Sequence, residues 1–107
     1  MQAYSKHESN GIVYYFDEDT PVRIVFQGNE NLAYSREYYY DERKLYFVFC
    51  YQGSEEYRFY FDDDILIRYI NADKEIFDLG SSDMKVYNER WDFILEEAYA
   101  ALKTIPK

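Results

Sequence analysis

Residues 38–49 read Tyr38-Tyr39-Tyr40-Asp41-Glu42-Arg43-Lys44-Leu45-Tyr46-Phe47-Val48-Phe49, an aromatic triplet followed by an Asp, a short polar turn and an apolar segment. Aromatic and β-branched residues favour strands, where their side chains pack on a pleated surface. An Asp at the start of a turn accepts a hydrogen bond from its own backbone two residues on. The stretch therefore predicts a β-hairpin with strands over 33–40 and 44–52.

The same pattern occurs twice more in the chain, at Tyr14-Tyr15-Phe16-Asp17 and at Phe59-Tyr60-Phe61-Asp62. Three such hairpins predict an antiparallel meander. Its six strands are expected near 11–16, 22–27, 33–40, 44–52, 55–61 and 65–71. The turns after Asp41 and Asp62 contain no glycine, so we expect Arg43 or Asp64 to occupy a left-handed backbone conformation.

Alternation along the strands predicts a sheet with two different faces. In 55–61 one face carries Tyr57, Phe59 and Phe61, and the other carries Glu56, Arg58 and Tyr60. In 44–52 strict alternation places Leu45, Phe47 and Phe49 together and opposes them to Tyr46, Val48 and Cys50. A sheet that is covered on one side and half-solvated on the other has this pattern.

The cover is predicted to be a C-terminal helix. Apolar residues recur at spacings of three and four, at Met84, Tyr87, Trp91, Ile94, Leu95, Ala98 and Leu102. Ser81 and Ser82 are candidate N-caps with Asp83 in the first turn, and Pro106 follows the expected end near Lys103. The fold class is thus α+β: an antiparallel β-meander of about six strands with one long C-terminal α-helix packed on one face. Trp91 is the expected anchor of that helix.

We expect one domain over residues 11–107, preceded by a flexible segment over 1–10. The net charge of −9 argues against nucleic acid and anionic membranes as partners. No apolar run is long enough to insert directly into a membrane, and the first residues resemble no signal peptide. An extracytoplasmic location is expected if a targeting segment has been trimmed before Met1, and a cytoplasmic one otherwise.

The sequence contains no recognisable catalytic motif, so we expect no enzyme. Cys50 and His7 are the only residues of their types, which predicts neither a metal site nor a bound cofactor. Carboxylates gather at the three predicted hairpin tips: Asp17, Glu18, Asp19, Asp41, Glu42, Asp62, Asp63 and Asp64. They form either a shared rim for Ca²⁺ or a basic partner, or simply solvated turns, which we favour because calcium requires converging oxygens.

The candidate binding surface is the Tyr-rich face of the sheet. We assign to it Tyr15, Tyr39, Tyr46, Tyr60 and Tyr69, together with Arg58. Exposed tyrosines anchor protein partners or stack on sugars, because the ring is apolar while the hydroxyl stays wet. Strand propensity and cross-strand pairing explain the same residues without any ligand.

The segments 37–49, 55–62 and 66–70 resemble a domain of tandem aromatic–Asp hairpins with an acidic C-terminal helix, found in uncharacterised bacterial cell-envelope proteins and lipoproteins. The resemblance covers about residues 35–103, departs from the pattern where Arg43 and Asp64 replace glycine, and implies export but no activity or site residues. We therefore expect a non-enzymatic interaction module of an exported or envelope-anchored protein. The alternative is a small acidic inhibitor or immunity-type protein acting on a basic protein partner.

Overall fold

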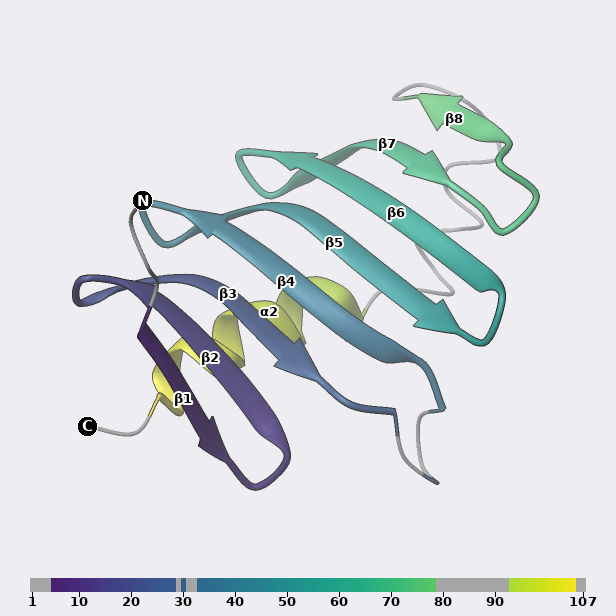
Figure 1. Ribbon diagram of the computed structural model, residues 1–107. Coiled ribbons are helices and arrows are strands. Elements are labelled where there is room, and N and C mark those ends of the chain that lie inside the picture. Colours follow the sequence, from purple (N-terminus) through teal and green to yellow (C-terminus); the bar gives the residue numbers. More distant parts are fainter. Residues whose placement is uncertain (1–4, 29, 31–32, 79–92, 106–107) are drawn as a thin grey trace.

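The computed structural model describes residues 5–28, 30, 33–78 and 93–105 of the 107-residue chain. Within them the strands are β1 (Ser5–Ser9), β2 (Ile12–Asp17), β3 (Thr20–Phe26), β4 (Ser35–Asp41), β5 (Lys44–Gln52), β6 (Glu55–Asp62), β7 (Ile65–Ile70) and β8 (Ile76–Asp78), and the helix is α2 (Phe93–Lys103). The eight strands of this described part form one sheet in sequence order, with every neighbouring pair antiparallel (Figure 1). The α+β class with an antiparallel sheet and a C-terminal helix is therefore confirmed.

The predicted number of strands was too low, because one further strand lies at each edge of the sheet. Residues 1–10 were expected to be a flexible segment, but Ser5–Ser9 form β1 and pair with β2. The turn between them is Asn10-Gly11, whose φ angles of 53° and 79° fit a two-residue hairpin. At the other edge, β8 follows the last strand that we expected, at 65–71.

The three aromatic–Asp segments form the three hairpins β2–β3, β4–β5 and β6–β7, and each hairpin contains a bulge at the same place. Tyr39 pairs with Phe47 while Tyr40 pairs with Leu45, so Tyr46 is the extra residue. Val22 and Ile67 are the extra residues of the other two hairpins. In the β4–β5 turn Glu42 and Arg43 have φ angles of 51° and 67°, and in the β6–β7 turn Asp63 and Asp64 have 50° and 66°. The left-handed turn residues predicted from the missing glycines are thus present.

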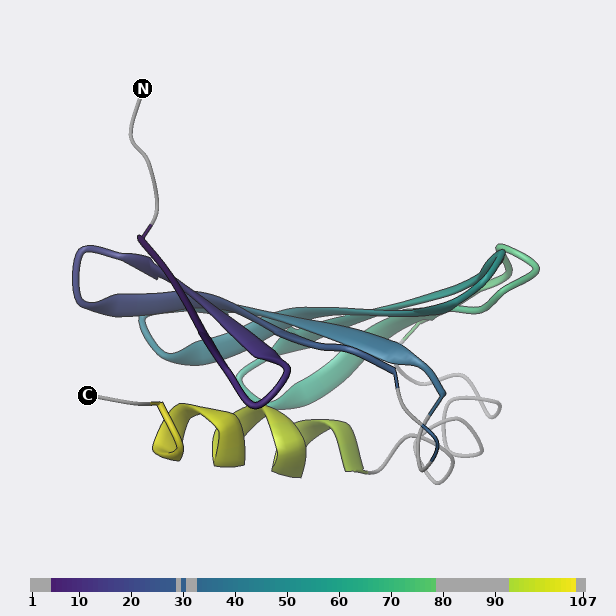
Figure 2. The same cartoon turned by 60° about the horizontal axis from the view of Figure 1, so that its bottom comes forward.

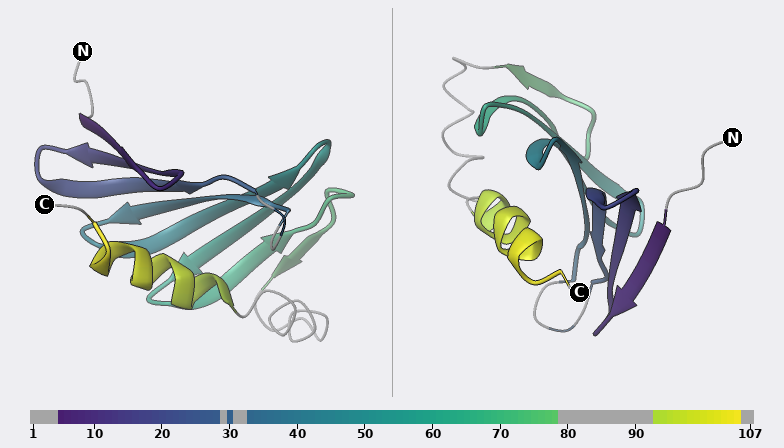
Figure 3. Two further views of the ribbon diagram at one scale, coloured as in Figure 1. Left: turned by 90° about the horizontal axis from the view of Figure 1, so that it is seen from below. Right: turned by 90° about the vertical axis from the view of Figure 1, so that its left-hand side faces the viewer.

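Helix α2 lies along one face of the twisted sheet, which we call the inner face (Figures 2 and 3). Its buried residues Ile94, Ala98, Ala101 and Leu102 belong to the same core cluster as the buried side chains of β2 to β7. The spacing of these four residues places them on one helical stripe. The predicted start of the helix lies outside the described residues. This applies to the expected caps Ser81 and Ser82, to Asp83 in the first turn and to the expected anchor Trp91.

Polar contacts fix α2 on the inner face as well. Arg36 is only 4% exposed, and its guanidinium donates to Glu97 through Nε at 2.7 Å and through a terminal nitrogen at 3.1 Å. The hydroxyl of Tyr38 donates to the same carboxylate, and that of Tyr40 donates to the Ala98 carbonyl at 2.6 Å. Charge-assisted bonds of this kind hold the helix in a defined position on strand β4.

Candidate functional site

The face of the sheet opposite α2, which we call the outer face, carries a continuous row of aromatic and arginine side chains. Directly paired residues of neighbouring strands lie on the same face, and the pairing runs unbroken across the sheet. The row, here named the aromatic row, consists of Tyr15 on β2, Arg23 on β3, Tyr39 on β4, Phe47 on β5 and Tyr60 on β6. Its outer neighbours are Lys6 on β1 and Arg68 on β7.

Each member of the aromatic row contacts the next. The Arg23 guanidinium lies 4.8 Å from the ring centre of Tyr15 and 5.5 Å from that of Tyr39. The ring centres of Tyr39 and Phe47 are 5.4 Å apart, and those of Phe47 and Tyr60 are 5.0 Å apart. The rings are tilted by about 46° and 47°, so they pack against each other's sides and leave no single flat platform.

Glu37 organises the centre of the row. Its carboxylate accepts a hydrogen bond from Arg23 at 2.7 Å and another from the Tyr39 hydroxyl at 2.8 Å. Burial and then this carboxylate raise the pKa of Tyr39 to about 12, because both disfavour a phenolate. The centre of the row is therefore held in place by contacts within the chain itself.

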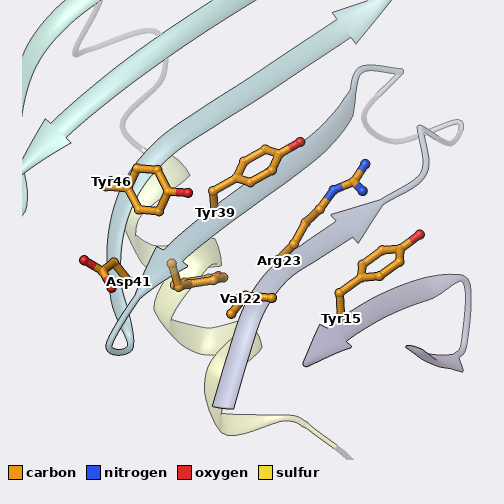
Figure 4. A pocket seen from close by; sticks show the side chains of 7 residues that line it. Tyr15, Val22, Arg23, Tyr39, Asp41 and Tyr46 are labelled. Carbon is orange, nitrogen blue, oxygen red and sulfur yellow. The ribbon is translucent and has the colours of Figure 1, made fainter. Parts of the chain in front are cut away.

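A shallow hollow of about 570 Å³ opens beside the row (Figure 4). It is lined by Tyr15, Val22, Arg23, Tyr39, Tyr40, Asp41 and Tyr46. The bulge turns Tyr46 toward this face, where it lies beside Tyr39 and remains 47% exposed. The hollow thus combines apolar rings with one carboxylate and one guanidinium.

The structure places five of the six predicted binding residues on the outer face. Tyr15, Tyr39 and Tyr60 are half-buried within the row, and Tyr46 is exposed next to it. Arg58 lies in the adjacent row, where its guanidinium is 5.0 Å from the ring centre of Phe49.

Tyr69 was wrongly assigned to this surface. It is fully buried on the inner face, where it pairs with Phe59 and their ring centres are 4.9 Å apart. The extra residue Ile67 changes the alternation of β7, and this directs Tyr69 toward the core.

Arg23 and Phe47 are the members of the row that the sequence analysis missed. Strict alternation grouped Phe47 with Leu45, whereas the bulge at Tyr46 sends Leu45 to the core and Phe47 to the outer face. The internal repeat contained a usable signal, because Arg23, Phe47 and Arg68 each lie eight residues after the middle aromatic residue of a triplet.

The exposed large hydrophobic side chains of the described residues all belong to the outer face. They are Tyr46 at 47%, Ile65 at 55%, Ile67 at 37% and Ile76 at 57% exposure. The strand pairing supports this placement. Ile65 pairs with Asp62, and Ile76 pairs with Ile70, which in turn pairs with Arg58 on the outer face. The apolar groups that remain exposed in the described part of the chain are therefore on the face that bears the aromatic row.

The carboxylates of the hairpin tips, which we expected to be solvated turn residues, gather on one side of the molecule. The tips of β2–β3, β4–β5 and β6–β7 emerge at the same end of the sheet (Figure 1). Part of this charge is used internally, because Asp64 accepts hydrogen bonds from the Tyr99 hydroxyl and, at 3.4 Å, from Lys44. In the described part of the chain, no three acidic, histidine or cysteine side chains converge as a metal site requires.

Cys50 has the environment of an inert core residue. It is fully buried beneath α2, and burial raises the pKa of its thiol to about 12. A thiol in this state is a poor nucleophile.

Among residues 5–28, 30, 33–78 and 93–105, no helix is both long and apolar enough to cross a membrane.

Searches of protein-family models, of curated proteins and of solved structures each returned no match to this chain. The resemblance to cell-envelope hairpin domains therefore remains a prediction, and the functional argument rests on the geometry of the outer face.

Proposed function

We infer that this chain is a non-enzymatic binding module that receives a protein partner on its outer face. The observation that carries the inference is the position of the exposed Tyr46, Ile65, Ile67 and Ile76, all on the face that bears the aromatic row. Tyr, Phe and Arg are enriched in the centres of protein interfaces, where they contribute most of the binding energy.

The chemistry of the surface favours a protein over a glycan. Sugar rings stack on flat aromatic faces, whereas the rings of the row are tilted against one another. The three exposed isoleucines add aliphatic area that a hydroxyl-rich ligand does not match but an apolar protein surface does. The envelope location implied by the resemblance remains part of the proposal.

Site-specific photo-crosslinking in the native host tests this proposal. A photoreactive phenylalanine analogue replaces Tyr46 on the outer face, and matched variants carry it at Asp63 on the acidic tips or at Thr104 after α2. We expect a protein adduct from position 46 that disappears when Ile65→Ser and Ile67→Ser are added. Adducts of equal yield from position 104, or none from position 46, contradict the proposal.

The acidic tips support a second candidate, an inhibitor that occludes a basic protein. The three tips carry eight carboxylate side chains and only two basic ones, Arg43 and Lys44. Such a surface steers a basic partner electrostatically, so its association rate falls steeply with salt. An adduct from position 63 alone, with a salt-sensitive yield, favours this function over the first.

A further inference from the structure

Strand β1 is an open edge of the sheet, and its surface is polar. It is the first strand in the order, and in the described part of the chain no strand pairs with its outer side. Its sequence is Ser5-Lys6-His7-Glu8-Ser9, of which all but Ser9 are exposed. Among the described residues, neither Lys6 nor Glu8 takes part in an ion pair.

The Asn10-Gly11 turn determines which backbone groups of β1 remain available. Residues flanking a two-residue turn exchange hydrogen bonds with each other, and the pattern then alternates along the strand. Ser9 and Ile12 flank this turn, so Ser9, His7 and Ser5 direct their backbone groups to β2. Lys6 and Glu8 direct theirs to the open edge.

We propose that β1 pairs antiparallel with β1 of a second copy of this chain, around a two-fold axis at His7. In this register Lys6 of each copy lies opposite Glu8 of the other, so both edge-facing residues find a backbone partner and an opposite charge. Opposite charges directly across an antiparallel pair stabilise it. The strand is thus complementary to itself, as a two-fold interface requires.

The strand at the other edge of the sheet, β8, does not have this property. Pairing of β8 with its own copy around Phe77 places Ile76 opposite Asp78, which joins an apolar side chain to a charge. The two-fold axis at β1 also reverses the second copy, so the acidic tips of the two chains lie at opposite ends of the dimer. The outer faces of both copies lie on the same side of the continuous sheet, whatever binds to them.

The interface is short, so the dimer is expected to be transient, and the test covers protein concentrations from about 10 µM to about 1 mM. Sedimentation velocity should show dimers of the unmodified chain at the upper end. Lys6→Glu and Glu8→Lys should each weaken association by at least about tenfold, because each places like charges opposite one another. An equimolar mixture of the two variants, or the double variant alone, should regain the dimer.

The Glu8→Lys variant distinguishes the effect of this register from repulsion between two acidic chains. It makes each chain less negative, which reduces that repulsion, and yet it should dimerise less. A monomer throughout the range, or association that is unaffected by the charge exchange, overturns the proposal.

A cysteine placed at the axis gives an independent test of the register. Position 7 lies opposite itself in a pair without mutual hydrogen bonds, where Cα atoms are about 4.5 Å apart and a disulfide fits. His7→Cys should therefore form a disulfide-linked dimer under mild oxidation. The control Ser5→Cys should not, because its two copies lie about 13 Å apart along the strands. Equal crosslinking at both positions contradicts the register.

Discussion

At the scale of single residues, Tyr39 shows how the aromatic row is held by the side chains around it. Its ring lies between Arg23 and Phe47, and its hydroxyl is bound to Glu37. The elevated pKa of Tyr39 is a direct reporter of this arrangement, because it depends on burial and on the neighbouring carboxylate.

The alkaline titration of Tyr39 is expected to have a midpoint near pH 12, against about 10 for a free tyrosine. The phenolate difference spectrum between the native chain and Tyr39→Phe isolates this group. Since the folded pKa is raised, the stabilising contribution is complete below about pH 10 and is lost as pH rises toward 12. Glu37→Gln should lower the midpoint, and the matched Glu56→Gln should leave it unchanged.

Asp64 links the β6–β7 tip to the helix, and this link should depend on acid. The hydrogen bond from Tyr99, followed by Lys44, lowers the pKa of Asp64. The stabilisation that comes with a lowered pKa is complete above the pKa of the unfolded state, near 4. It is lost as the pH falls through the pKa of the folded state. Asp64→Asn should reduce the free energy of unfolding by about 0.5–1 kcal/mol at pH 7.

In urea unfolding at a pH below the folded pKa of Asp64, the same substitution should have little effect. The control Asp63→Asn changes the neighbouring turn residue, which is far more exposed than Asp64 and lies 3.5 Å from Lys44. A pH-independent loss in Asp64→Asn, or an equal loss in the control, would show that the carboxylate of Asp64 is not the stabilising group.

At the scale of elements, helix α2 is joined to the sheet by an ion pair that is buried at Arg36 and partly exposed at Glu97. Arg36 on β4 is almost fully buried, and its charge is balanced by Glu97 on α2. The neighbouring Glu96 is exposed, so the two glutamates form a matched pair on one helix. Removing one partner of a buried pair leaves an uncompensated charge, which is more damaging than the lost bond.

Glu97→Ala should reduce the free energy of unfolding by about 3–5 kcal/mol, because it leaves Arg36 buried without its carboxylate. Glu97→Gln retains hydrogen-bond acceptance and should be less damaging. Glu96→Ala should change the free energy by less than about 0.5 kcal/mol. Chemical denaturation followed by circular dichroism measures all three, and equal effects of the two alanine variants would show that α2 is not anchored through Glu97.

At the scale of the whole molecule, the single cysteine reports on opening of the core. Cys50 is fully buried between the sheet and α2, and the pKa of its thiol is about 12. A thiol reagent should therefore react only with molecules that have opened. In Glu97→Ala the rate should rise roughly 10²–10⁴-fold, in proportion to the loss of stability. Fast modification of the unaltered native chain would mean that the inner face is accessible near β5.

Much of the hairpin architecture could be predicted because its signals are local. Each aromatic triplet, Asp and polar turn specifies a strand, a reversal and a second strand within about a dozen residues. The missed strand β1 also had a local signal, the Asn10-Gly11 pair. Strand β8 had only a weak signal, because three residues do not establish a periodicity.

The candidate surface was predicted less completely than the hairpins. Four tyrosines and Arg58 were assigned to the correct face, whereas Tyr69 was assigned to the wrong one. In β5 the assignments of Phe47, Phe49, Val48 and Cys50 were all reversed. These errors have the same physical origin. A bulge adds one residue to one strand, and this reverses the alternation of every side chain beyond it.

By itself, the sequence determined that this chain forms successive hairpins with an amphipathic helix after them, because turn chemistry and hydrophobic periodicity act over short distances. Only the tertiary structure decided which face each side chain occupies, because the bulges at Val22, Tyr46 and Ile67 are set by pairing between strands. It also decided that tyrosines, arginines and isoleucines far apart in the chain share one surface. That surface exists because the strands lie in order across the sheet while α2 covers the opposite face.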